Sequence, residues 1–197
     1  MGLTITQNLP LTARRGWTRE EFERLTEMGF FGPEERLELI EGEIVPKMTQ
    51  NEPHATGVYL VQTALLRIFT TGYMVRVQLP LALGTASRPE PDIAVVTGSP
   101  RDYQTSPTTT VLVVEVSDTT LALDRAVKAS LYASAGIPEY WIVNLIDRVL
   151  EVHRAPASMA AQPLGYGYGN ITHLSAHETV APLAAPQQAI AVADLLP

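Results

Sequence analysis

The hydrophobic positions along the chain follow two periods, one typical of helices and one typical of strands. Thr18 and Glu21 have the spacing of a capping box and open a short predicted helix over residues 18–28. Residues 38–45 hold two short apolar stretches separated by Gly42, which indicates a tight β-hairpin or a bulged strand. The first part of the chain therefore predicts a helix followed by a small β element.

The rest of the chain repeats these two periods up to about residue 153. Apolar residues at helical spacing predict helices, and alternating or continuous apolar runs predict strands. The spacing predicts helices over about 53–71 and 120–135, and strands over 73–83, 91–96, 111–116, 140–143 and 149–153.

The order of these elements predicts a mixed sheet. A strand, a helix and a strand across residues 111–145 imply a right-handed crossover with parallel pairing, and the hairpins add antiparallel pairing. We therefore expect an α/β (mixed α+β) protein with helices on a mixed sheet, in a single domain over 1–197. The pattern is loose from about residue 155, where we expect short peripheral strands, with 189–195 as the last.

Composition narrows the range of functions. The chain has 197 residues, a formal net charge of −7 and no cysteine. The absence of cysteine excludes disulfides, zinc–thiolate sites and cysteine nucleophiles. An acidic protein is not a general binder of DNA, so contact with nucleic acid needs a basic patch or a bound cation. Residues 1–10 lack the pattern of a signal peptide and no apolar run is long enough to cross a bilayer, so we expect a soluble, cytoplasmic protein without membrane contact.

Two carboxylates are the main candidates for chemistry. Glu115 lies inside an apolar strand, where a lone charge is costly to bury and needs a cationic partner, a proton or a metal. Its alternatives are a salt bridge or a strand-end position that faces water. Asp92 follows Pro91 at the start of a strand. Its alternative is a role in an ordinary turn, because Pro-Asp is common where strands begin. If the two strands are neighbours, the acids repel each other unless a cation lies between them, and oxygen ligands suit Mg²⁺ or Mn²⁺.

Lys128 is the third candidate. It lies on the helix after the Glu115 strand, and that helix must fold back over the sheet, so its side chain could reach the same site. The alternative is a surface bridge to Asp124, four residues earlier.

Six pieces of the chain together resemble the Uma-two family of restriction-endonuclease-like proteins, within the PD-(D/E)XK nuclease superfamily. They are residues 37–45 (LELIEGEIV), His54, residues 91–96 (PDIAVV), 113–117 (VVEVS), 124–128 (DRAVK) and 132–143 (YASAGIPEYWIV). The resemblance covers about residues 15–155.

The resemblance implies a fold and a set of site residues. It implies a restriction-endonuclease-like mixed β-sheet core flanked by helices, with Asp92 and Glu115 as metal-binding and catalytic acids. The lysine expected two residues after Glu115 is replaced by Ser117, and in this family it is thought to have moved to the next helix, which points to Lys128. Glu43, and also Glu38, could supply a further carboxylate from an N-terminal element; otherwise they lie on a solvated hairpin edge.

The leading hypothesis is therefore a Mg²⁺- or Mn²⁺-dependent nuclease that hydrolyses phosphodiester bonds in DNA. By analogy with other nucleases of this fold, we also expect a homodimer. The alternative is a non-catalytic nucleic-acid-binding or structural protein that retains the nuclease fold. His54, at the start of a predicted helix, either lies near the site or caps the helix, and Gln78 could point towards the site from the polar face of its strand.

Overall fold

A six-stranded mixed sheet forms the centre of the computed structural model, which describes residues 15–47 and 50–197. The N-terminal ten residues, for which the sequence predicts no signal peptide, lie outside this part. The strand order is β3-β4-β5-β6-β7-β8, and β5 and β6 pair in parallel while the other neighbours pair antiparallel. The six strands are β3 (Tyr73–Val77), β4 (Ile93–Thr97), β5 (Leu112–Ser117), β6 (Glu139–Asn144), β7 (Val149–Ser158) and β8 (Tyr166–Ser175).

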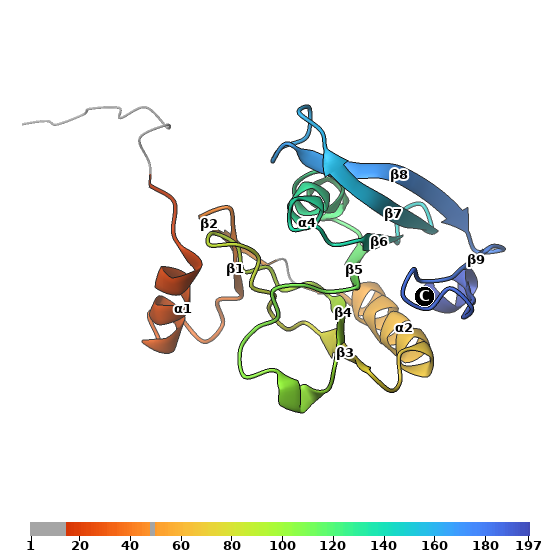
Figure 1. Cartoon of the computed structure of the whole chain (residues 1–197), viewed down its shortest axis with the longest axis horizontal. Helices are drawn as coiled ribbons and strands as arrows, with labels where there is room; N and C mark the ends of the chain where they lie inside the picture. The colour runs from red at the N-terminus through yellow and green to blue at the C-terminus, as the bar shows by residue number, and fades with distance from the viewer. Residues whose placement is uncertain (1–14, 48–49) are drawn as a thin grey trace, which may run out of the picture.

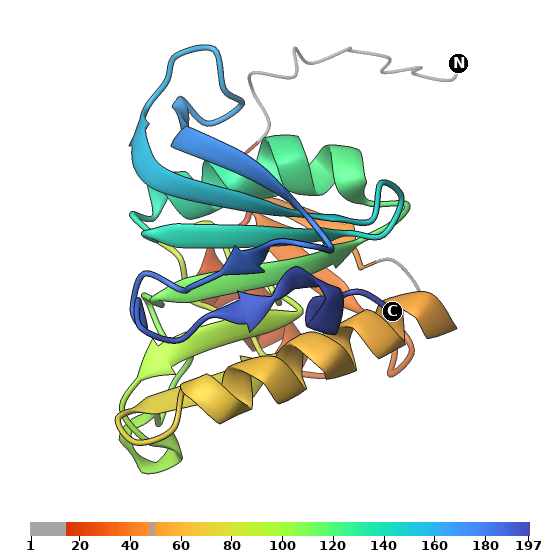
Figure 2. The same ribbon diagram turned by 90° about the vertical axis from the view of Figure 1, so that its right-hand side faces the viewer.

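Each face of the sheet is covered by different segments (Figures 1 and 2). The long helix α2 (Glu52–Ile68) packs on one face, together with the C-terminal segment that contains β9 (Thr179–Val180), β10 (Ile190–Ala191) and the 3-10 helix η4 (Val192–Leu195). The other face carries a helix in three parts, namely α3 (Leu121–Leu123), the π-helical turn η3 (Asp124–Lys128) and α4 (Ala129–Ser134).

The N-terminal elements include a hairpin that adds Ile40 and Val45 to the core on the second face. The helix α1 (Arg19–Glu27) begins at a capping box between Thr18 and Glu21. It leads into a separate hairpin of β1 (Leu37–Ile40) and β2 (Glu43–Pro46), as expected from Gly42. A short 3-10 helix, η2 (Pro100–Asp102), lies in the loop between β4 and β5.

The alternation of apolar side chains explains why two cores form. Leu112, Val114 and Val116 of β5 belong to the core under α2, whereas Val113 belongs to the core under α4. Glu115 has the same parity as Val113, so its side chain lies on the face covered by α3, η3 and α4. All six side chains of β5 are buried, as the apolar run predicted.

The fold class and the parallel crossover are confirmed, but three predicted strand boundaries are wrong. The strand predicted over 73–83 ends at Val77, because Gln78 has a φ of +50° and Pro80 has no N–H to donate. The chain after 155 contributes the short peripheral strands that were expected, β9 and β10, but also a ten-residue strand of the main sheet, β8, that was not. The strand predicted over 189–195 is limited to Ile190–Ala191 and continues as a 3-10 helix.

None of the helices in the described part of the chain is long and apolar enough to span a membrane.

Gly42 allows a close approach between two backbone segments. It has a φ of +81°, and a Cβ added there would lie 2.9 Å from the Cα of Gly16. Gly72 has a similar φ of +84°, but a Cβ there would meet nothing within 4 Å. A side chain at Gly72 therefore introduces backbone strain alone, whereas a side chain at Gly42 also clashes with the backbone of Gly16.

We predict that Gly72→Ala lowers the free energy of unfolding by about 1–2 kcal/mol, the cost of a left-handed non-glycine residue. Gly42→Ala should lower it by more, because the strain is similar and a clash with backbone is added. Urea unfolding followed by tryptophan fluorescence measures both values. Equal losses in the two variants would contradict the close approach at Gly42.

Candidate active site

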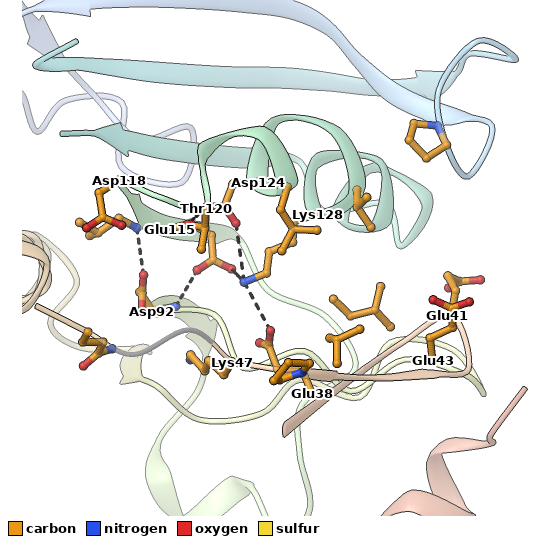
Figure 3. A pocket seen from close by; sticks show the side chains of 18 of the residues that line it. Glu38, Glu41, Glu43, Lys47, Asp92, Glu115, Asp118, Thr120, Asp124 and Lys128 are labelled. Carbon is orange, nitrogen blue, oxygen red and sulfur yellow. Dashed lines mark hydrogen bonds and ion pairs between the residues drawn. The ribbon is translucent and has the colours of Figure 1, made fainter. Parts of the chain in front are cut away.

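Asp92 and Glu115 lie side by side on neighbouring strands (Figure 3). The antiparallel register pairs Ile93 with Val114, so Asp92, one residue before β4, lies opposite Glu115. The Asp92 amide donates a hydrogen bond to Glu115 Oε2 (3.2 Å), and the Val116 amide donates one to Asp92 Oδ2 (3.0 Å). Both side chains are 3% exposed. The backbone thus fixes the orientation of two buried carboxylates.

Lys128 reaches this pair from the helix above it. Its Nζ donates a hydrogen bond to Glu115 Oε1 (2.9 Å) and lies 3.6 Å from Glu38 Oε2 and 3.8 Å from Asp124 Oδ1. Lys128 is 6% exposed, so its contact with Asp124 is part of a buried network and not a bridge at the surface. The structure therefore brings Asp92, Glu115 and Lys128 together in one cluster, the arrangement that the family resemblance implies and that spacing alone left open.

The π-helical turn η3 explains how the helix presents Lys128. A π turn is rare and adds one residue to a helical turn, which shifts the side chains that follow it. In η3, Asp124 and Lys128 are buried towards the cluster, while Arg125 points to Glu151 and contacts it at 2.7 Å. Asp124 accepts hydrogen bonds from the hydroxyl groups of Ser117 and Thr120, which hold it in place.

Tyr132 is a member of the cluster that the sequence did not identify. Its hydroxyl donates a hydrogen bond to Glu115 Oε1 (2.7 Å), the same oxygen that Lys128 contacts. Tyr132 lies four residues after Lys128, a spacing that places two side chains on one helix face. That spacing is the signal in the sequence that could have identified Tyr132.

Two further side chains contact Asp92. His54 Nε2 lies 3.3 Å from Asp92 Oδ1, and Gln78 Nε2 donates a hydrogen bond of 3.4 Å to the same oxygen. His54 is near the start of α2, where Asn51 caps the helix by accepting from the His54 amide. His54 therefore lies at the site, and its backbone also takes part in the helix cap.

The two carboxylates predicted from the β1–β2 hairpin, Glu38 and Glu43, lie in different parts of the pocket. Glu38 is 3% exposed, faces Lys128 and accepts a hydrogen bond from the Glu90 amide (2.6 Å). Glu43 is exposed on β2, and in Figure 3 it lies with Glu41 at the end of the pocket away from Asp92. Of the two acids that the sequence proposed from this hairpin, the structure brings Glu38 to the cluster and leaves Glu43 apart from it.

Burial and neighbouring charges shift the acid–base behaviour of the cluster. Burial raises the pKa of Glu115 to about 7, because the nearby carboxylates add to the effect of desolvation and Lys128 only partly offsets it. Burial favours the neutral form of Lys128, but the surrounding carboxylates outweigh it and raise the pKa of this side chain above its usual value. The His54 ring and the Val116 amide hold the pKa of Asp92 below its ordinary value, against the effect of burial.

The charge of the cluster favours a bound cation. Glu38, Asp92, Glu115 and Asp124 carry four negative charges when ionised. Lys128 carries one positive charge and His54 adds another when it is protonated, which leaves an excess of two or three negative charges. A buried excess of charge is costly unless a cation or protons offset it.

The donor set suits a hard cation with few protein ligands. Asp92 and Glu115 each accept three hydrogen bonds, of about four that a carboxylate can accept, so each retains room for one more interaction. Within residues 15–47 and 50–197, no group of three or more His, Asp or Glu is arranged to hold a metal. Mg²⁺ commonly binds one or two carboxylates and completes its shell with water and substrate phosphate, so the pair fits this ion.

The mixed sheet flanked by helices is a restriction-endonuclease-like fold. Residues 19–193 match the model of the Uma2 family, described as "Putative restriction endonuclease". The chain belongs to this family.

Solved structures of similar fold include the following one. It is described as "a putative nuclease belonging to DUF820" from Anabaena variabilis ATCC 29413, and it is 17% identical in sequence. The match covers 90% of this chain and 96% of that chain, with a TM-score of 0.66. A comparison with curated proteins finds none that matches.

We predict that Lys128→Met lowers the free energy of unfolding by about 3–5 kcal/mol, because it leaves buried carboxylates without their cation. The double variant Lys128→Met/Glu115→Gln should recover part of this loss, since it also removes one of the unpaired charges. Denaturant unfolding in buffer with a chelator measures both. Arg24→Met, on the exposed face of α1, is the control and should change stability by less than about 0.5 kcal/mol. A Lys128→Met variant as stable as this control would show that Lys128 is not a buried counter-ion.

Proposed function

We propose that the chain is a metal-dependent nuclease that hydrolyses phosphodiester bonds in DNA, with Asp92, Glu115 and Lys128 as its central residues. The observation that carries this proposal is the contact of Lys128 with Glu115 at 2.9 Å while Glu115 lies beside Asp92. The family description and the similarity in fold to a protein described as a nuclease support it.

Asp92 and Glu115 would hold Mg²⁺ or Mn²⁺. A bound cation of this kind lowers the pKa of a water molecule and polarises the scissile phosphate. Lys128 would orient that water and stabilise the negative charge that develops on the phosphate, and the burial of its ammonium group beside Glu115 supports this role. Tyr132 and Glu38 would position Glu115 and Lys128 and would not touch the substrate.

Binding of a metal should depend on both acids. Isothermal titration calorimetry with Mn²⁺ should give one site in the wild-type chain, and Asp92→Asn or Glu115→Gln should weaken binding by about tenfold or more, because each removes a charged ligand. Asp194→Asn is the matched control, since Asp194 is exposed in η4 against the opposite face of the sheet. Unchanged affinity in both site variants would exclude this metal site.

Cleavage of DNA should depend on the metal ion and on Asp92, as binding of the metal does. Wild-type protein with Mn²⁺ should nick supercoiled plasmid or cut single-stranded DNA, and EDTA should stop the reaction. Asp92→Asn should reduce the rate by about 10²–10³-fold, because it removes part of the electrostatic stabilisation of the transition state. Asp194→Asn should leave the rate unchanged. Equal activity in wild-type protein and Asp92→Asn would contradict the assignment of Asp92.

A second candidate is a non-catalytic protein that retains the nuclease fold. The short contact between Lys128 and Glu115 favours it, because an internal cation can partly neutralise the acids without a metal. This candidate predicts no heat of binding with Mg²⁺ or Mn²⁺ and no cleavage of any DNA. The calorimetric titration of wild-type protein therefore separates the two candidates.

A further inference from the structure

The pocket at the acidic cluster continues into an apolar compartment that the proposed reaction does not use. The pocket has a volume of about 430 Å³. Asp92, Glu115 and Lys128 line one part of it. Apolar side chains form another part of the lining, among them Ile40, Val45, Leu123, Val127, Pro163 and Leu164.

Three separate elements build this apolar wall. Ile40 and Val45 come from the β1–β2 hairpin, Leu123 and Val127 from the α3–η3 helix, and Leu164 from the turn between β7 and β8. The Leu164 amide donates a hydrogen bond to Ser130 Oγ (3.0 Å), which fastens the turn to α4. Ile40 is buried, and Val45, Val127 and Leu164 are partly buried against the same core, whereas Leu123 is 40% exposed at the edge of the wall.

The size and lining of the pocket fit a small ligand better than a DNA duplex. Ligand pockets typically measure about 300–1,000 Å³ and are mostly apolar with a few polar groups. Duplex DNA carries one negative charge per about 1.7 Å of its axis, so a surface that follows it needs several cationic side chains. Among the described lining residues the ammonium groups are Lys47 and Lys128, and carboxylates outnumber them.

The arrangement of polar and apolar parts matches a nucleotide. A nucleotide joins an anionic phosphate to a flat base whose faces pack against apolar groups and whose edge is polar. The pocket joins the acidic cluster to an apolar wall, with Glu41 and Glu43 at the end away from Asp92. A base within a duplex is stacked and cannot enter such a pocket, whereas an unpaired base can be taken up between apolar side chains.

We propose that the pocket receives one unpaired nucleotide of a DNA strand, with its base against the wall of Ile40, Val127 and Leu164 and its phosphate at Asp92, Glu115 and Lys128. The inference rests on the proposed nuclease function for the role of the phosphate end. It adds that the substrate is a single-stranded, flapped or bulged segment and not a continuous duplex.

Binding of small molecules tests the pocket without any reaction. In calorimetric titrations with Mn²⁺ present, dAMP should bind wild-type protein about 10-fold to 100-fold more tightly than deoxyribose 5-phosphate, which lacks the base. Leu164→Trp should remove most of this difference by filling the compartment. Leu66→Trp is the size-matched control, because Leu66 is exposed on α2 about 18 Å along the helix axis from His54.

Cleavage of designed duplexes tests the consequence for the substrate. A labelled duplex with a single unpaired nucleotide should be cut at that nucleotide about tenfold or more faster than the fully paired duplex. A duplex with an abasic residue at the same bulge should lose most of that advantage, because its phosphate is present but its base is not.

The outcomes separate the inference from the proposed function. If paired, bulged and abasic duplexes are cut equally and dAMP binds no better than deoxyribose 5-phosphate, the nucleotide pocket is wrong and the nuclease function stands. If dAMP shows the predicted preference but no DNA is cut, the pocket stands and the nuclease function is wrong. If Leu164→Trp retains the full preference for dAMP, or Leu66→Trp loses it, the base does not lie against the proposed wall.

Discussion

The structure of the site depends on one buried ion pair, between Lys128 and Glu115. Removing either charge from water costs several kcal/mol, so the pair is stable only with good geometry and further hydrogen bonds. Tyr132 and the Asp92 amide supply these bonds to Glu115, and Glu38 and Asp124 add negative charge around Lys128. The cluster joins β1, β5 and the helix over them, with Asp92 at the start of β4. It still holds more negative than positive charge, which is the condition for binding a cation.

The fold brings these groups together through two local features. The first is the register of β4 and β5, which sets Asp92 opposite Glu115 and lets the backbone of each strand bond to the acid of the other. The second is the π turn Asp124–Lys128. It directs the side chains of its first and last residues into the cluster, while Arg125 reaches Glu151. The same helix and the β1–β2 hairpin also provide the apolar side of the pocket, so the chemistry and the proposed base pocket share one scaffold.

Much of this arrangement could be predicted from the sequence. The capping box at Thr18, the apolar run around Glu115 and the strand–helix–strand order each depend on local patterns, and the structure follows them. The end of β3 at Gln78 could not be predicted, because the alternation of apolar residues continues past a left-handed residue. The buried position of Glu38 was also uncertain, since Glu38 and Glu43 occur in similar sequence surroundings and only the packing of the hairpin distinguishes them. Spacing places Asp124 and Lys128 one helical turn apart but does not reveal a π turn, and it does not decide between a surface bridge and a buried one.

The central claim is that Asp92 and Glu115 bind one divalent cation beside Lys128. A crystal structure of the protein soaked in Mn²⁺, with anomalous diffraction data, tests it most directly. A bound Mn²⁺ should give a single strong anomalous peak at about 2.1 Å from an oxygen of each carboxylate, the distance at which such ions bind oxygen, with water completing the shell. An absence of any peak at these residues, with Lys128 still bonded to Glu115, would contradict the claim.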